Sequence, residues 1–345
     1  MAYTTIKKPS DYFNTKIFTG DGSLPRAITG IGHQPDFVWL KNRDVGYQHQ
    51  LYDSVRGTSA GVLYSSLSDA EDSTYQMSSF DSDGYTMGSQ MGAVNGSGEN
   101  IVSWSWKANG AGSSNTDGSI TSTVSANTTS GFSIVSYTGN NIDGTTVGHG
   151  LGVNPSAILF KRRDSTSNWS LMGQNIGTAF SSYLKLETTD AFDTNGGMLQ
   201  NSNSSTFTIG TNSRVNASSA SMIAYCFAEK KGFSKFGSYT GNGNDDGTFV
   251  YTGFSPSFVI RKRTDSADSW QMHDNKRDTF NATYHRLLAN DSGSEYTSIS
   301  NQLDFLSNGF KCRASNSGAN GSGGSYIYMA FAEQPLVGDN PCTAR

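Results

Sequence analysis

Two pairs of opposite charge are the residues best placed to do chemistry. Asp53 is followed three positions later by Arg56, and Asp274 is followed three positions later by Arg277. An exposed pair at this spacing braces a turn and contributes about 0 to 1 kcal/mol. Arg beside aromatic rings would instead suit a sugar-binding or subunit contact, and the sequence leaves both interpretations open. The aromatic side chains that complete this candidate binding set, and that we expect to be partly exposed, are Tyr47, Trp169 and Trp270.

Catalytic chemistry has weaker support. Hydrolysis of a polysaccharide needs two carboxylates roughly 5 to 10 Å apart, and the densest acidic cluster consists of Asp69, Glu71 and Asp72. These residues lie in a Ser-rich polar stretch that is typical of a solvated loop. The five histidines lack the HxH or HExxH spacing of metal ligands, and there is no GxSxG nucleophile motif. We therefore expect no catalytic residues, no metal, no cofactor and no enzymatic activity.

The charged pairs belong to a pattern that occurs three times in the chain. Its first block reads PDFVWLKNRD at residues 35–44, PSAILFKRRD at 155–164 and PSFVIRKRTD at 256–265. Pro, Lys and Asp keep the same spacing in all three blocks. A self-similarity of this kind indicates an internal repeat.

The register of the repeat continues beyond each block. Five residues after the closing Asp stands His49, Trp169 or Trp270, and nine residues after it stands Asp53, Gly173 or Asp274. The second copy therefore carries Gly173 and Ile176 where the other copies carry the Asp and the Arg of the charged pair. If that pair serves binding, the middle copy has lost it.

Each copy closes on a segment of alternating large apolar residues. In the first copy these are Val102, Trp104 and Trp106, and the corresponding segments are residues 223–227 and 327–331. A period of two indicates a strand with one buried face. We expect these side chains to line the core of each copy rather than a surface for stacking ligands.

The pattern predicts an all-β fold made of three tandem repeats of a β-sandwich, jelly-roll-like, each of roughly 100 residues with many short strands. Packing of the copies around a pseudo-threefold axis is a further possibility, although the joints between them differ. Residues 119–124 could form a strand that pairs onto a neighbour. The expected boundaries are 1–11 (N-terminal docking segment), 12–110 (first repeat), 111–130 (Gly/Ser-rich joint), 131–230 (second repeat), 231–336 (third repeat) and 337–345 (C-terminal tail).

Composition argues against several classes of partner. A formal net charge of −4 gives no basic footprint for nucleic acid. No apolar run approaches the ~20 residues that span a bilayer, and the first residues lack the apolar region of a signal peptide. The three cysteines form no CxxC pair, which argues against a disulfide framework. We expect a protein made in the cytosol, with no nucleic-acid partner and no membrane insertion.

Several of these segments resemble a repeat family found among predicted proteins of marine tailed phages, described as tail-fibre or virion-structural proteins. The segments that carry the resemblance are residues 4–15, 35–39, 53–57 and 104–110. The resemblance implies a non-enzymatic structural protein of a bacteriophage virion, made in the cytoplasm of the bacterial host. It supplies no catalytic or ligand-binding residues.

Two roles in the particle follow from the resemblance and the tandem arrangement. The first is a tail-fibre or receptor-binding (host adhesion) component, in which many weak contacts with a host surface glycan add up through avidity. The alternative is capsid decoration or another part of virion architecture. A polysaccharide depolymerase is a distant alternative. The expected partners are other phage virion proteins, a host glycan, and further copies of the chain, as a homotrimer or as many copies per particle.

Overall fold

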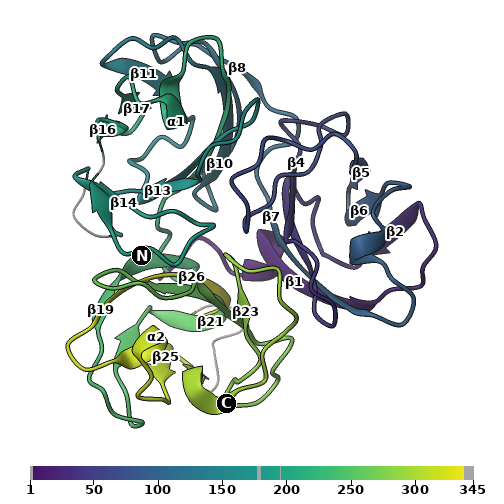
Figure 1. Cartoon of the computed structure of the whole chain (residues 1–345), viewed down its shortest axis with the longest axis vertical. Helices are drawn as coiled ribbons and strands as arrows, with labels where there is room; N and C mark the ends of the chain where they lie inside the picture. The colour runs from purple at the N-terminus through teal and green to yellow at the C-terminus, as the bar shows by residue number, and fades with distance from the viewer. Residues whose placement is uncertain (1–2, 177–179, 195, 338–345) are drawn as a thin grey trace.

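The computed structural model, which describes residues 3–176, 180–194 and 196–337, consists almost entirely of β-strands, loops and turns. Its helices are single turns of three or four residues, so the expected all-β fold class is confirmed. The strands gather into three lobes around a common centre, coloured purple to blue, teal, and green to yellow along the chain (Figure 1). Among the described residues, no helix is long and apolar enough to cross a membrane.

Lobe 1 pairs a four-stranded sheet, in the order β1-β7-β3-β4, with a three-stranded sheet, in the order β2-β6-β5. Its elements are η1 (Pro9–Asp11), β1 (Phe13–Thr19), β2 (Arg26–Thr29), β3 (Phe37–Asn42), β4 (Gln50–Asp53), β5 (Met77–Asp81), β6 (Gly84–Met87), η2 (Gly92–Val94) and β7 (Asn100–Trp106).

Lobe 2 has a six-stranded sheet in the order β13-β12-β18-β10-β9-β8, a three-stranded sheet β11-β17-β16, and a small ladder β14-β15. Its elements are β8 (Ser113–Asn115), β9 (Ser122–Asn127), β10 (Phe132–Thr138), β11 (Thr145–Gly148), β12 (Ala157–Arg162), β13 (Ser170–Met172), β14 (Ser182–Tyr183), β15 (Asp193–Thr194), β16 (Leu199–Ser202), β17 (Thr206–Ile209), α1 (Ser213–Asn216) and β18 (Ser221–Phe227).

Lobe 3 has a five-stranded sheet in the order β19-β26-β21-β22-β23 and a three-stranded sheet β20-β25-β24. Its elements are β19 (Ser234–Thr240), β20 (Phe249–Tyr251), β21 (Phe254–Arg263), β22 (Gln271–Asp274), β23 (Leu287–Leu288), η3 (Ile299–Asn301), β24 (Leu303–Leu306), β25 (Gly309–Cys312), α2 (Ser317–Asn320) and β26 (Ser325–Pro335).

Each lobe is sandwich-like, because the inner faces of its two main sheets share a core. In lobe 1, Val38 and Tyr52 of the larger sheet pack in one cluster with Tyr85 and Met87 of the smaller sheet. Lobes 2 and 3 have corresponding clusters of their own. The larger sheets also share one strand order: the closing strand lies in the middle of β1-β7-β3, β10-β18-β12 and β19-β26-β21. The last strand of each triplet carries the Pro-Lys-Asp block.

A fourth apolar cluster lies at the centre and draws side chains from all three lobes. The Phe331 ring of lobe 3 lies 5.0 Å from Phe13 and 5.5 Å from Trp106 of lobe 1, measured between ring centroids. It also lies 6.1 Å from Phe227 of lobe 2. The packing leaves a small apolar cavity of about 40 Å³, too small for a drug-sized ligand. The three lobes therefore share one core as well as having their own.

The alternating residues of the closing strands face this shared core. Val102, Trp104 and Trp106 are buried, as predicted, but they belong to the central cluster and not to the sandwich core of lobe 1. The opposite face of β7 carries Ile101, which packs in the sandwich core, and buried serines. Both faces of the strand are covered, because it separates two cores. The expectation that these side chains line the core of each copy is thus corrected.

The segments outside the expected repeats are also packed. Ile6 is buried in the central cluster, and the Tyr3 hydroxyl donates a hydrogen bond to the Gly253 carbonyl of lobe 3, so residues 3–11 lie against the molecule itself. The expected joint 111–130 contributes β8 and β9 to the large sheet of lobe 2, where β9 pairs with β10. The strand suggested for residues 119–124 is therefore present, but it spans Ser122–Asn127. Residues 1–2 and 338–345 of the expected terminal segments lie outside the described residues.

Candidate functional site: polar seams between the lobes

The Asp53–Arg56 pair is a buried brace at the end of β4. Arg56 Nε donates to Asp53 Oδ2 at 2.5 Å, and the Arg56 backbone N–H donates to Asp53 Oδ1 at 2.9 Å. The remaining guanidinium nitrogens donate to the Gly61 and Leu51 carbonyls. Burial alone would lower the pKa of Arg56, but Asp53, Tyr225 and Glu71 outweigh it and raise that pKa. Asp274 and Arg277 repeat the arrangement, with 2.6 Å between Nε and Oδ2.

Both braces reach into a neighbouring lobe. The Tyr225 hydroxyl of lobe 2 donates to Asp53 Oδ2 at 2.7 Å, and the Trp104 Nε1–H of lobe 1 donates to Asp274 Oδ2 at 3.1 Å. Tyr225 and Trp104 hold equivalent positions on their closing strands. We call the contact between lobes 1 and 2 seam 1/2, and that between lobes 3 and 1 seam 3/1.

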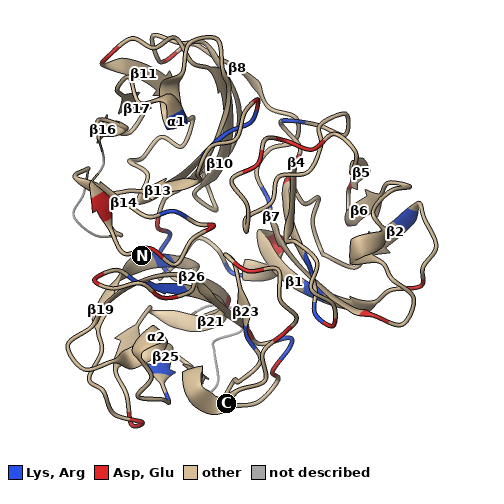
Figure 2. Ribbon diagram, in the orientation of Figure 1, with Lys and Arg blue, Asp and Glu red and all other residues tan. Residues whose placement is uncertain are grey.

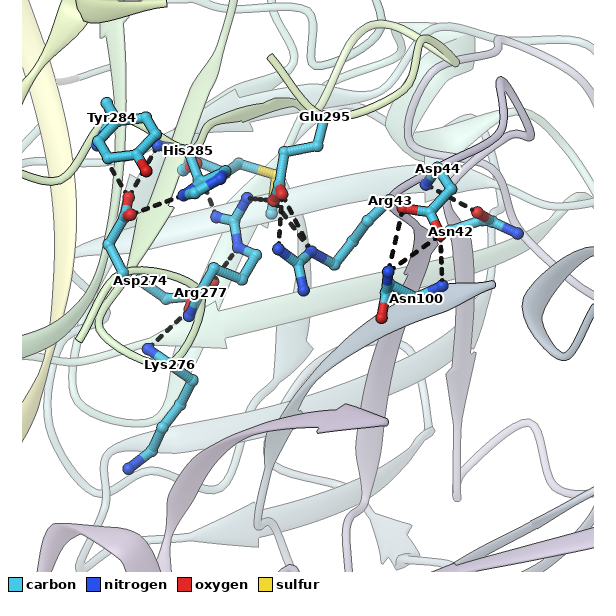
Figure 3. Close-up of polar contacts among 12 residues, drawn as sticks. Asn42, Arg43, Asp44, Asn100, Asp274, Lys276, Arg277, Tyr284, His285 and Glu295 are labelled. Atoms are coloured by element: carbon cyan, nitrogen blue, oxygen red, sulfur yellow. Dashed lines mark hydrogen bonds and ion pairs between the residues drawn. The ribbon is translucent and has the colours of Figure 1, made fainter. Parts of the chain in front are cut away.

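A second carboxylate completes each seam. In seam 1/2, Glu71 accepts from Arg56 at 3.1 Å and from Arg163 of lobe 2 at 2.7 Å. These charge-assisted bonds outweigh the burial of Glu71 and lower its pKa. In seam 3/1, Glu295 accepts from Arg277 at 2.8 Å and from Arg43 of lobe 1 at 2.6 Å. Figure 3 shows Glu295 between these two arginines.

The contact between lobes 2 and 3, seam 2/3, has the same backbone geometry but different side chains. The Phe192 N–H donates to the Thr264 carbonyl at 2.9 Å, as Glu71 N–H does to Arg163 and Glu295 N–H to Arg43 in the other seams. In seam 2/3, Gly173 and Ile176 replace the Asp–Arg pair, and Phe192 replaces the Glu. Met329 replaces the aromatic donor of the closing strand, and Thr264 replaces the Arg of the neighbouring lobe. All of the charged members are replaced together.

The buried rings of the candidate set also connect lobes. Trp169 Nε1–H donates to the Tyr64 carbonyl of lobe 1, and Trp270 Nε1–H donates to the Lys185 carbonyl of lobe 2, both at 2.8 Å. His49 takes the corresponding place in lobe 1: its Nδ1 accepts from Trp39, so we infer that Nε2 carries the proton that bonds the Leu288 carbonyl. Burial lowers the pKa of His49 and keeps it neutral.

The structure corrects the expected partial exposure of two of the three candidate rings, Trp169 and Trp270. Tyr47 is 42% exposed, whereas the other six members are buried: Asp53, Arg56, Trp169, Trp270, Asp274 and Arg277. The turn-bracing interpretation of the two pairs is confirmed, except that the pairs are buried and not exposed. These six residues join lobe to lobe within one chain, so they offer no free surface for a sugar.

The acidic cluster is largely engaged in structural contacts. Glu71 belongs to seam 1/2, and Asp72 Oδ2 accepts from the Tyr64 hydroxyl at 3.1 Å. Only Asp69 lies exposed. Among the residues that the structure describes, no group of three or more His, Cys, Asp or Glu side chains could hold a metal ion.

Residue identities alone could have revealed the partners that the sequence analysis missed. In the two seams with an Asp–Arg pair, the closing strand of the neighbouring lobe contributes Tyr225 or Trp104, each of which donates a hydrogen bond to the Asp. Where the pair becomes Gly173 and Ile176, the corresponding residue is Met329, which has no donor. Such joint substitution at equivalent positions is a signal of contact.

The lysine of each Pro-Lys-Asp block is buried and donates to backbone carbonyls. Lys161 Nζ reaches the Ser68 carbonyl of lobe 1 at 2.8 Å, and Lys41 Nζ reaches the Asn42 carbonyl at 2.6 Å. Lys262 Nζ lies 2.5 Å from the Arg263 carbonyl. Burial lowers the pKa of each of these lysines to about 8.

We predict that the free energy of unfolding rises between pH 7 and pH 9. The unfolded chain keeps the lysine proton up to its ordinary pKa of 10.5, while the folded protein releases it above about 8. Because the unfolded chain binds more protons than the folded protein, raising the pH from 7 to 9 increases the free energy of unfolding by about 1 kcal/mol per lysine. This gain is lost as the pH falls through the folded pKa. Urea unfolding at pH 7, 8 and 9 measures it. The Lys262→Met variant should show about two thirds of the slope, and a flat or falling profile in the wild type would contradict the assignment.

The fold and the seams define a class: an all-β protein of three sandwich-like lobes joined by a shared aromatic core and by buried polar contacts. Residues 8–335 match the model of a family described as a domain of unknown function, DUF7483. The match covers nearly the whole sequence, so the chain belongs to this family. No curated protein and no solved structure matches the chain.

Proposed function

We propose that this protein is a non-enzymatic structural component of a bacteriophage virion, with a tail-fibre or receptor-binding role. The observation that carries the proposal is the use of the buried charges and rings as internal braces between lobes. Such braces produce a rigid body that can display surface loops, which suits a structural or adhesive part. The resemblance of residues 4–15 and 104–110 to phage repeat proteins supports the same role.

Lobe 3 is the lobe that would make the outward contact. Of the large hydrophobic side chains exposed in the described part of the chain, Phe280 is 82% exposed and Ile299 is 71% exposed. Two bridges, Thr283–Leu303 and Arg286–Tyr296, pair the chain that follows Phe280 with the segment that contains Ile299. Exposed apolar side chains mark interaction sites where they form a contiguous patch. The further exposed rings of this lobe are Phe249, Tyr251, Tyr284 and Tyr296.

The chemistry of this surface bears on the two roles. Exposed tyrosine rings can stack on a sugar, which favours receptor binding. Phe280 and Ile299 lack hydrogen-bonding groups, and their exposure favours burial against another protein of the particle, as in capsid decoration. Lys and Arg are spread over the three lobes in this view (Figure 2).

Cryo-electron microscopy of the intact particle tests the proposal by locating this chain. We expect density at the tail with lobe 3 pointing outward. Density spread over the capsid lattice with lobe 3 covered would replace receptor binding by decoration, and absence of the chain from the particle would overturn both roles.

The contribution of lobe 3 can be measured separately on a glycan array with the purified chain. The Tyr251→Ser and Tyr284→Ser variants should lose most of the binding signal, because these are exposed tyrosine rings of lobe 3. Ile142→Ser in lobe 2 is the matched control, since Ile142 is also exposed, at 62%. Equal binding by all variants would exclude this surface.

A further inference from the structure

Lobe 3 contains two arginines and a histidine at positions where the other lobes have core residues. Arg261 and His273 are fully buried, and Arg286 is half-buried. The corresponding positions in lobe 1 are Leu40, Tyr52 and Val62, and those in lobe 2 are Phe160, Met172 and Tyr183, all of which belong to the sandwich cores. Three positions on adjacent segments have therefore changed together from core residues to groups that can carry a positive charge.

Strand pairing brings the three side chains to one place. Arg261 lies opposite Gln271 on β21 and β22, and His273 is two residues further along β22 on the same face. The antiparallel register that pairs Met272 with Leu287 continues to His273 and Arg286. All three side chains thus face the interior of the sandwich, away from the central core.

Most of the donors in this cluster have no acceptor. Arg261 Nη2 donates to the Asn301 carbonyl at 2.6 Å and to Gln271 Oε1 at 3.2 Å, and Nη1 donates to Cys312 Sγ at 3.5 Å; none of these acceptors is a carboxylate. Arg261 Nε, both ring nitrogens of His273, and Nε and Nη1 of Arg286 are buried without a hydrogen-bond partner. Leaving so many buried donors unsatisfied is costly, and native proteins rarely do so.

In the described part of the chain the positive charge also lacks a directly bonded counterion, because the Asp268 carboxylate acts on Arg286 only at a distance. No carboxylate among the described residues forms an ion pair with Arg261 or Arg286 at 4.0 Å or less. Asp268 accepts instead from Ser269 N–H and from the Ser317 hydroxyl. Burial, together with the charges of Arg261, Arg277 and Arg286, lowers the pKa of His273. Buried charges are normally paired, so this arrangement is complete only with a negative group.

We propose that lobe 3 binds a small oxyanion between Arg261, His273 and Arg286. Guanidinium groups match the geometry of phosphate, sulfate and carboxylate, and each of these can accept several of the unsatisfied donors at once. Arg286 is the half-buried member of the cluster, with its guanidinium 5.2 Å from the centre of the Tyr296 ring, and the proposal places the entry of the oxyanion beside it. The site does not depend on the proposed role in a virion.

Thermal unfolding of the full chain in increasing inorganic phosphate tests the proposal, with sodium chloride at equal ionic strength as the reference. The midpoint of the wild type should rise saturably, by about 4 °C or more at high occupancy. Arg286→Gln should lose most of this response and, in chloride, should melt above the wild type because it removes an unpaired charge. Arg162→Gln in lobe 2 is the matched control, since Arg162 pairs with Asp164 at the surface.

Phosphate stabilises many proteins without binding a site, so the decisive quantity is the difference between the wild type and Arg286→Gln. An equal rise in both, or no rise in the wild type, would overturn the proposal. A variant carrying the lobe 1 residues, with Arg261→Leu, His273→Tyr and Arg286→Val, should fold and show no specific response. The oxyanion could be a free ion or the acidic group of a sugar, and repeating the titration with glucuronate separates these two sources. A response to phosphate alone indicates a free ion, whereas a response to both indicates that the acidic group of a sugar can also enter.

Discussion

Arg277→Ile is expected to lower the free energy of unfolding by about 3 to 5 kcal/mol, the typical cost of removing one partner from a buried ion pair. The substitution leaves Asp274 buried with only Trp104 as a side-chain donor, and it removes one of the two arginines of Glu295. The Met272 carbonyl also loses the bond from Arg277 Nη2. Urea unfolding at neutral pH measures the loss.

Converting the whole of seam 3/1 to the composition of seam 2/3 should restore most of that stability. Well-packed apolar residues can replace a buried ionic cluster at little cost, and seam 2/3 shows a set that fits this geometry. A loss of stability in Arg277→Ile alone could come from lost packing. Recovery of stability in the fivefold variant shows instead that the loss comes from leaving buried polar groups without their partners. The five substitutions are Arg43→Thr, Trp104→Met, Asp274→Gly, Arg277→Ile and Glu295→Phe.

The control for this series is Arg162→Ile, which breaks the partly exposed pair with Asp164 and should cost about 1 kcal/mol or less. A cost for Arg277→Ile as small as that of the control would show that the seam does not depend on its charges. A fivefold variant less stable than Arg277→Ile would show that the apolar set depends on features peculiar to lobes 2 and 3.

Phe331→Ala is expected to cost about 3 to 5 kcal/mol and to destabilise all three lobes together. The Phe331 ring contacts Phe13 and Trp106 of lobe 1 and Phe227 of lobe 2, so its removal opens a cavity that every lobe borders. Because the central core is shared, unfolding should remain a single transition. Urea titrations followed by tryptophan fluorescence and by far-ultraviolet circular dichroism should give the same midpoint.

The matched control is Phe280→Ala, which truncates the same side chain where it is 82% exposed and should change stability by no more than about 0.5 kcal/mol. Separate transitions for the two probes, or stable folding of a single lobe expressed alone, would show that the lobes are independent and that the central core only fastens them together.

The sequence by itself determined the all-β class and the burial of one face of each closing strand. Alternation at Val102, Trp104 and Trp106 depends only on the two-residue period of a strand, which is a local property of the chain. The Asp53–Arg56 pair was recognisable for the same reason, since a spacing of three residues lets the Asp side chain accept from the Arg backbone within one turn.

Only the tertiary structure decided what these elements pack against. A period of two shows that a face is covered but not by what, so the sequence could not place Trp104 in a core shared by three lobes. The Asp53–Arg56 pair likewise contacts Tyr225, far along the chain, whose hydroxyl donates to Asp53. Long-range contacts of this kind depend on how whole sheets meet, and no local spacing encodes that arrangement.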